Sequence, residues 1–205
     1  MTADVAVENL TEHKLPTAYP SRRAWLHMTV RDAAGHTVFE SGHLRADGSI
    51  VGNDNDADAR TFEHHHTEIR SADDVQIYEP ILGTATGEVT TGLLSTTQYL
   101  KDNRLLPRGF TKERASADTA VHGEALADPD FTGGGDRVRY IVGVGDAAGP
   151  LTVEAELLYQ PIGFRWAHNL GRYRAASEPR RFVRFYEEMA DGGSARLSRA
   201  TATLR

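Results

Sequence analysis

Two stretches in the last third of the chain alternate apolar with polar side chains, and this alternation restricts the fold more than any other feature of the sequence. They cover residues 137–144 and 151–160. A period of two is typical of a β-strand that buries one face and exposes the other. Residues 146–150 read DAAGP and predict a turn, so the two stretches together predict an antiparallel hairpin. The apolar positions are Val138, Tyr140, Val142 and Val144 in the first stretch, and Val153, Ala155, Leu157 and Tyr159 in the second.

Further strands are predicted in the first half of the chain and at its end. Residues 24–31 alternate in the same way, and a turn over 32–36 leads into 37–40, so these residues predict a second hairpin. Weaker strand patterns cover residues 5–9, 74–81 and 196–204. Residues 90–103 fit either a strand or a helix, because their threonines favour a strand while their leucines also recur at helical spacing.

One helix is predicted, over residues 178–189. Ser177 is a suitable N-cap, Pro179 stands in the first turn, and two glycines follow the end of the pattern. The apolar side chains of this segment recur at positions i, i+3, i+4 and i+7, and we expect them to pack against the core. They are Phe182, Phe185, Tyr186 and Met189.

Short strands with turns between them and a lone late helix favour a sandwich of two antiparallel sheets. The chain has 205 residues, of which 40% are hydrophobic and 25% charged, as is ordinary for a globular protein. No apolar run approaches the ~18 residues that a membrane-spanning helix needs. We therefore predict a single domain over residues 1–205 that is mostly β: an antiparallel Ig-like β-sandwich with long loops and one amphipathic helix near the C-terminus.

Charge and cysteine content exclude several classes of function. The net charge of −6 disfavours a nucleic-acid partner. The chain has no cysteine, which excludes disulfides, thiolate metal sites, cysteine nucleophiles and covalent attachment of haem. No G-x-S-x-G motif is present for acyl transfer. The first ten residues do not resemble a secretion signal, so we expect either a cytoplasmic protein or a domain excised from a longer one.

The densest cluster of oxygen ligands lies in residues 47–58, called the acidic loop below. Alternating aspartates repel one another, and Ca²⁺ takes about six to eight oxygen ligands in flexible geometry. The spacing differs from that of an EF-hand, since Ala59 stands where the glycine is required. The sequence predicts a structural calcium ion here, with a solvated acidic turn as the alternative. The candidate ligands are Asp47, Asn53, Asp54, Asp56 and Asp58.

Three consecutive histidines, 64–66, follow this loop and are flanked by Glu63 and Glu68. Neighbouring side chains of a strand point to opposite faces, so at most His64 and His66 converge on one metal ion. A metal-dependent enzyme that uses these residues is one alternative function. Surface histidines without a metal are the other interpretation.

The segment 9–20 is held extended by Pro16 and Pro20, and it presents His13 from a stiff loop between two predicted strands. Together with residues 21–26 it resembles the N-T-G-H-K-x-P-T-x-Y-P-x-R-R-x-W segment of many bacterial multihaem c-type cytochromes. The resemblance continues through residues 52–58, 101–107, 133–140 and 159–167.

This resemblance implies a cysteine-free β-rich domain that follows a haem-binding region, with His13 as a distal axial ligand to a neighbouring haem. Glu12 stands where the family has glycine, and the haem-attachment motifs are missing. Haem would therefore come from a partner chain or from an N-terminal region outside this chain. The family's Pro-His-Tyr aligns with residues 64–66, which makes His65 the matched position.

The leading hypothesis is a non-catalytic accessory domain that packs against a multihaem cytochrome electron-transfer module, in the periplasm or outside the cell. It has no transmembrane segment and no nucleic-acid partner. Besides the enzyme, a calcium-dependent adhesive or carbohydrate-binding module is an alternative, and exposed Trp25 or Trp166 beside the acidic loop would favour it. Glu79 and Asp102 stand in apolar stretches, and we expect both to form structural ion pairs.

Overall fold

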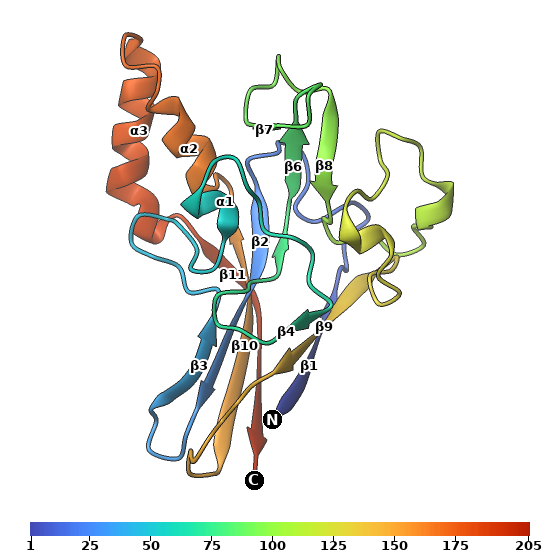
Figure 1. Cartoon of the computed structure of the whole chain (residues 1–205), viewed down its shortest axis with the longest axis vertical. Coiled ribbons are helices and arrows are strands. Elements are labelled where there is room, and N and C mark those ends of the chain that lie inside the picture. The colour runs from blue at the N-terminus through green and yellow to red at the C-terminus, as the bar shows by residue number, and fades with distance from the viewer.

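The computed structural model describes residues 1–205, and two sheets form its body (Figure 1). The larger sheet has the order β11-β10-β2-β3, with β5 also paired to β2, and all of its pairs are antiparallel. Its strands are β2 (Arg23–Arg31), β3 (Thr37–Ser41), β5 (Ile77–Tyr78), β10 (Leu151–Gln160) and β11 (Ala195–Leu204).

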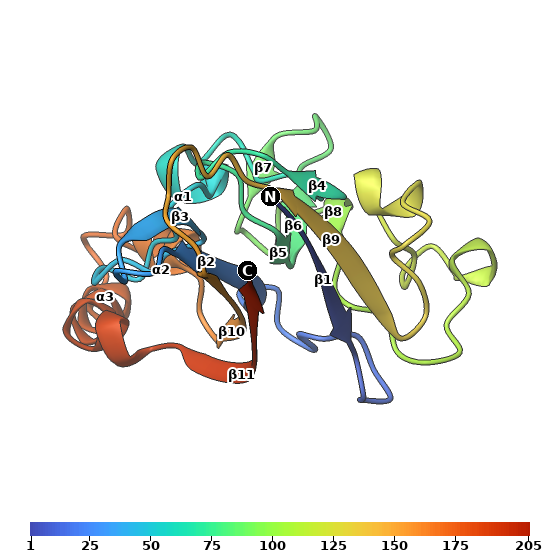
Figure 2. The same ribbon diagram turned by 90° about the horizontal axis from the view of Figure 1, so that it is seen from below.

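The second sheet has the order β1-β9-β4, and a third, small sheet has the order β7-β6-β8. β1 and β9 are antiparallel, whereas β4 is parallel to β9. Seen from below, the pair β1 and β9 lies beside the layer of β2, β10 and β11 (Figure 2). The strands are β1 (Thr2–Glu8), β4 (Glu68–Ile69), β6 (Pro80–Gly83), β7 (Val89–Thr90), β8 (Gln98–Asp102) and β9 (Gly135–Ile141).

The main core lies between the two larger sheets. The even-numbered residues of β2 face it, while the odd-numbered ones lie on the outer face, where Trp25 packs in a smaller apolar cluster. The alternation of the sequence thus decides which face of each strand is buried. Core residues include Leu26, Met28 and Val30 from β2, Val138 and Tyr140 from β9, and Leu151, Val153 and Leu157 from β10.

The structure confirms the mostly β, sandwich-like fold and the early hairpin of β2 and β3. The predicted hairpin of residues 137–144 with 151–160 is wrong, because β9 pairs with β1 and β4 while β10 pairs with β2 and β11. Both stretches bury their apolar face in the same core but belong to different sheets. The alternation of apolar and polar residues specifies which face of a strand is buried, but it does not specify which other strand pairs with it.

The weaker strand predictions also have counterparts. Residues 5–9 overlap β1, residues 196–204 lie in β11, and residues 74–81 contain β5 and the start of β6. In the ambiguous segment 90–103 the ordered element is the strand β8. Every residue of β11 is exposed, so this strand forms a solvent-facing edge of the larger sheet.

The late helix is present as α3 (Ser177–Met189), but two details of its prediction are wrong. Ala176, not Ser177, occupies the N-cap position, and no residue of α3 is buried. Phe185 is 50% exposed and Met189 67% exposed, so the aromatic stripe borders an apolar groove with residues 160–162 instead of entering the core.

Two shorter α-helices were not predicted, α1 (Asp54–Ala57) and α2 (Phe164–Leu170), because neither is long enough for a helical period to be recognised in the sequence. Three short 3₁₀ turns complete the structure: η1 (Lys112–Arg114), η2 (Glu124–Leu126) and η3 (Ala190–Gly192). None of the helices has both the length and the apolar character needed to cross a membrane.

Candidate functional site: a braced loop that presents His13

The loop of residues 9–16, called the His13 loop below, is fixed at its start by the buried side chain of Asn9. The side-chain oxygen of Asn9 accepts a hydrogen bond from the backbone N–H of Thr11 at 2.9 Å. Its amide nitrogen donates to the carbonyl oxygens of His13, at 2.8 Å, and Leu105, at 3.0 Å. A single asparagine thereby closes the turn and ties it to a distant segment.

The far end of the loop is held by Leu15 and Lys14. The backbone groups of Leu15 and Leu105 exchange two hydrogen bonds of 2.9 Å. The ammonium of Lys14 lies 2.7 Å from a carboxylate oxygen of Asp102, which is fully buried and also 2.7 Å from Arg104. Burial raises the pKa of Asp102, but the hydrogen bonds and charges of Arg104 and Lys14 outweigh it and hold that pKa below its usual value. The ammonium of Lys14 therefore holds the end of the His13 loop against the buried carboxylate of Asp102.

His13 lies between these two anchors and is exposed. Its Nδ1 lies 3.2 Å from the carbonyl oxygen of Lys14 and 3.3 Å from the hydroxyl of Thr11. A carbonyl oxygen can only accept, so the proton is assigned to Nδ1. Nε2 then carries a lone pair, and it makes no hydrogen bond with the chain. Histidines that bind a metal through Nε2 are in this tautomer, and their Nδ1–H is commonly donated to a carbonyl or carboxylate group.

In the acidic loop, the carboxylate of Asp56 is buried and makes structural contacts within the chain. Asp56 accepts a hydrogen bond of 2.9 Å from the guanidinium of Arg23, and its second oxygen accepts one of 2.8 Å from the backbone N–H of Ile50. Arg23 and Asp56 are both buried. Arg165 donates to the carbonyl oxygens of Asn55 and Asp56. Arginine side chains thus neutralise and brace the centre of this loop.

The other four predicted calcium ligands also have separate surroundings. Asp47 accepts from the backbone N–H and hydroxyl of Ser49, and Asn53 caps α1 by accepting from the N–H of Asn55. Hydrogen bonds from Arg60 lower the pKa of Asp58 to about 2, while desolvation and the Glu63 carboxylate raise that of Asp54. The structure gives these ligands no common centre, and calcium binding here stays a prediction.

The histidines 64–66 do not converge on one position. His64 pairs with Glu124 at 2.9 Å, His66 pairs with Glu63 at 2.5 Å, and Glu68 pairs with Arg70. The enzyme alternative required His64 and His66 to share one metal, and the structure gives them different partners instead.

His65, the position matched to the cytochrome motif, lies in a buried polar network. Its Nε2 is 2.9 Å from Asp128, and its Nδ1 faces the side-chain amides of Gln76 and Asn103 at 2.8 and 3.0 Å. Nearby Asp136 accepts from the hydroxyl of Tyr78 at 2.7 Å. These partners come from distant parts of the sequence, so no local motif could have predicted the network.

The remaining sequence candidates have structural roles. Trp25 is fully buried and donates to the carbonyl oxygen of Gly42, and Trp166 packs edge-on against Tyr19. Trp25 therefore cannot contact a carbohydrate from the surface. Both expected ion pairs are present: Asp102 binds Lys14 and Arg104, as described above, and buried Glu79 lies 3.4 Å from the ammonium of buried Lys101.

Comparisons with known proteins place this fold in a specific context. No family model matches the sequence, and no curated protein matches it either. A penta-haem cytochrome c552 from Thermochromatium tepidum is a structural neighbour, with a TM-score of 0.52 over 99% of this chain and 14% sequence identity. The chain spans 36% of that cytochrome chain. The molecule is thus a mostly β, sandwich-like protein whose fold is similar to part of a multihaem cytochrome.

Proposed function

We propose that this chain is a non-catalytic accessory domain of a multihaem c-type cytochrome system, which packs against the haem-bearing segment and provides His13 as an axial ligand. The observation that carries the proposal is that Nε2 makes no hydrogen bond with the chain in an exposed histidine whose loop is anchored on both sides. Such preorganisation lowers the entropy lost when a ligand group binds its metal. The likeness to a penta-haem cytochrome supports haem as the partner.

The residues of this chain fit one part of a haem site and not the rest. With no cysteine, the chain cannot attach haem through thioether bonds, so the cofactor has to be held by another segment or chain. A neutral imidazole fits the axial position, and the iron would supply one-electron transfer there. His13 would supply the nitrogen donor, while Asn9 and Lys14 hold its loop in place.

An apolar surface beside this loop supports the packing role. Leu10 is 74% exposed, and it borders a groove between β1 and the edge strand β11. A partner that covers this groove would bury apolar surface next to His13. The apolar part of its lining includes Val5, Val7, Leu10, Leu26, Leu157 and Ala200, and charged side chains such as Glu8 and Arg199 also line it. On this proposal the domain lies in the periplasm or outside the cell, the location expected from the resemblance to multihaem c-type cytochromes.

The test is a spectroscopic titration of the domain with its co-purified haem-bearing partner. Wild type and His13→Ala are compared with His36→Ala, which removes another exposed histidine whose imidazole is 80% exposed and pairs only with Asp32. We expect His13→Ala to shift the Soret band and the reduction potential of one haem, and His36→Ala to leave both unchanged.

Two results would count against the proposal at different levels. Identical spectra and potentials for wild type and His13→Ala would remove the ligand role but not the packing role. Failure of the wild-type domain to bind any haem-bearing chain from its own source would remove both.

A further inference from the structure

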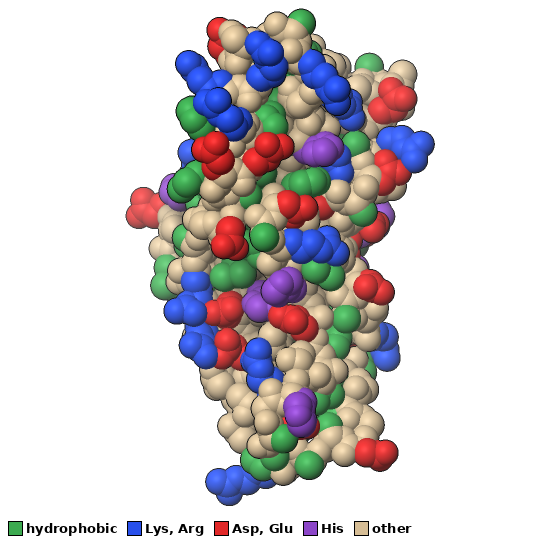
Figure 3. All heavy atoms as spheres, turned by 90° about the vertical axis from the view of Figure 1, so that its left-hand side faces the viewer, with side chains coloured by type: hydrophobic (Ala, Val, Ile, Leu, Met, Phe, Trp, Pro, Cys, Tyr) green, Lys and Arg blue, Asp and Glu red, His purple; other side chains and the backbone are tan.

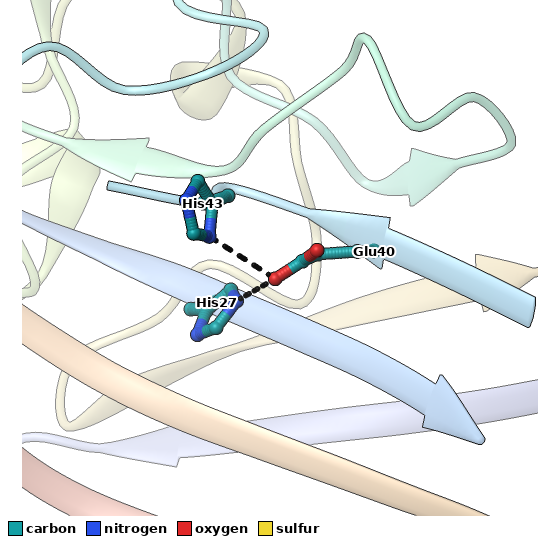
Figure 4. Close-up of side chains that lie close together, drawn as sticks. All are labelled: His27, Glu40 and His43. Carbon is teal, nitrogen blue, oxygen red and sulfur yellow. Dashed lines mark hydrogen bonds and ion pairs between the residues drawn. The ribbon is translucent and has the colours of Figure 1, made fainter. Parts of the chain in front are cut away.

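A second group of histidines lies on the outer face of the larger sheet, away from the core. His27 of β2, Glu40 of β3 and His43 just beyond β3 point toward one another (Figure 4). The Oε1 atom of Glu40 lies 2.9 Å from Nε2 of His27 and 3.2 Å from Nδ1 of His43. One ligand atom from each of the three residues lies within 4.8 Å of the other two.

The strand register and one glycine bring these side chains together. Glu40 stands opposite Thr29, which makes it a diagonal neighbour of His27 on the same face. Gly42 follows β3 with φ of +77° and turns the chain back over β2. A Cβ atom at this position would lie 2.4 Å from the carbonyl oxygen of Leu26, so only glycine fits. The backbone of His43 is then fixed by a hydrogen bond from the N–H of Val51.

The donor atoms are of the kinds that zinc takes. Two imidazoles and one carboxylate form a frequent protein ligand set for Zn²⁺, with bonds of about 2.0–2.2 Å. In a tetrahedron of that size the ligand atoms are about 3.3 Å apart. The distances of 2.9 and 3.2 Å from Glu40 to the two rings are close to this spacing.

A further carboxylate orients His27 from the opposite side. Glu156 of β10 is the direct cross-strand neighbour of His27, and its Oε2 lies 3.2 Å from Nδ1. Arg196 holds the other oxygen of Glu156 at 2.8 Å. Metal-binding histidines usually donate their second N–H to such a carboxylate. When Nδ1–H of His27 is donated to Glu156, Nε2 carries the lone pair and faces Glu40, so it is oriented to bind a metal ion beside that carboxylate.

We propose that His27, Glu40 and His43 bind one divalent transition-metal ion such as Zn²⁺, with Glu156 orienting His27 and water completing the coordination. The site is open to solvent, since the side chains of Glu40 and His43 are 34% and 55% exposed. Figure 3 shows histidine side chains beside acidic ones on the side of the molecule that carries β3 and α3. This site is independent of the haem partner proposed for His13.

The experiment is a calorimetric titration of the full chain with ZnCl₂, repeated with CoCl₂ while the visible absorption of Co²⁺ is recorded. We expect wild type to bind one equivalent of Zn²⁺ at this site. His43→Ala should lower the affinity at least about tenfold, and Glu156→Gln by about 10–100-fold. His36→Ala and His13→Ala are the matched controls and should keep the wild-type affinity.

Because His43 is exposed, its replacement leaves the fold intact, and circular dichroism checks this for each variant. Loss of the Co²⁺ absorption in His43→Ala with an unchanged circular dichroism spectrum supports the site. The proposal is overturned if wild type binds no Zn²⁺ at micromolar concentration. It is equally overturned if His43→Ala binds as tightly as wild type, or if His36→Ala or His13→Ala removes the binding instead.

Discussion

The His13 loop and the acidic loop both carry groups that could bind a metal. In the first loop the potential ligand atom has no partner within the chain, whereas in the second the most buried carboxylate is already paired. In the His13 loop, Asn9 and Lys14 make the structural contacts, and Nε2 of His13, the atom proposed to bind iron, makes no hydrogen bond with the chain. In the acidic loop, the central carboxylate of Asp56 is itself the structural contact, because Arg23 and the N–H of Ile50 occupy its two oxygens.

This difference shows that ligand chemistry in a sequence is not sufficient evidence of a site. A carboxylate that is already paired with a buried guanidinium has little to gain from a cation. A histidine whose loop is braced by other residues can bind an external partner without disturbing the fold. The same distinction separates His65, whose two ring nitrogens are both engaged, from His13.

The largest expected effect is on the acidic loop. Replacing Arg23 by methionine would leave the buried carboxylate of Asp56 without its charged partner, and loss of one member of a buried ion pair costs about 3–5 kcal/mol. Urea unfolding of Arg23→Met should show this loss of stability. The control is Arg60→Met, whose partner Asp58 lies at the surface, and it should leave the midpoint unchanged. Equal midpoints for the two variants would contradict the structural role of Asp56.

The next effect concerns the anchor of the His13 loop. Asn9→Ala removes hydrogen bonds to the carbonyl oxygens of His13 and Leu105 and should lower stability by about 1–3 kcal/mol. Hydrogen exchange of the amides in residues 9–16 should accelerate. Leu10→Ala, at the exposed neighbouring position, serves as the control and should change neither. Slow exchange in Asn9→Ala would show that the loop does not depend on this side chain.

A smaller effect is expected from pH through Asp102. Its pKa in the folded protein is below the ordinary value of 3.8, so the unfolded chain binds its proton more readily. The stability that Asp102 contributes is therefore present above about pH 4 and is lost as the pH falls through the folded pKa. Unfolding midpoints measured at pH 5 and pH 3 should differ less in Asp102→Asn than in wild type. An equal difference would exclude this carboxylate as a source of acid sensitivity.

The smallest effect is expected from calcium. Because Arg23 and Arg60 already pair with carboxylates of the acidic loop, addition of Ca²⁺ to chelator-treated protein should leave the melting temperature unchanged. A rise of the melting temperature that saturates with Ca²⁺ and disappears in Asp54→Asn would show that the ion predicted from the sequence does bind. Both loops would then carry a group that is available to a metal.

Local features of the sequence predicted local structure well. The turn over residues 32–36 defined the hairpin of β2 and β3, and the prolines around His13 indicated an exposed, stiff loop. Long-range pairing was not accessible from the sequence. Arg23 and Asp56 are 33 positions apart, and Arg165 and Asp56 are 109 apart, so the acidic residues looked unpartnered.

The histidine cluster on the outer sheet face shows the same limit. His27 and Glu40 lie in a hairpin that the alternation did predict, and the register of that hairpin could have suggested their contact. Glu156 comes from β10, which the sequence placed in a hairpin with residues 137–144 instead of beside β2. The error in strand pairing therefore concealed the residue that orients His27.

Electron paramagnetic resonance of the oxidised complex between the domain and its haem-bearing partner would show whether His13 binds a haem iron through its nitrogen. We expect one low-spin signal that is present with wild type to be replaced by a high-spin signal with His13→Ala, while the two proteins remain bound. An identical low-spin spectrum from both complexes would contradict this expectation.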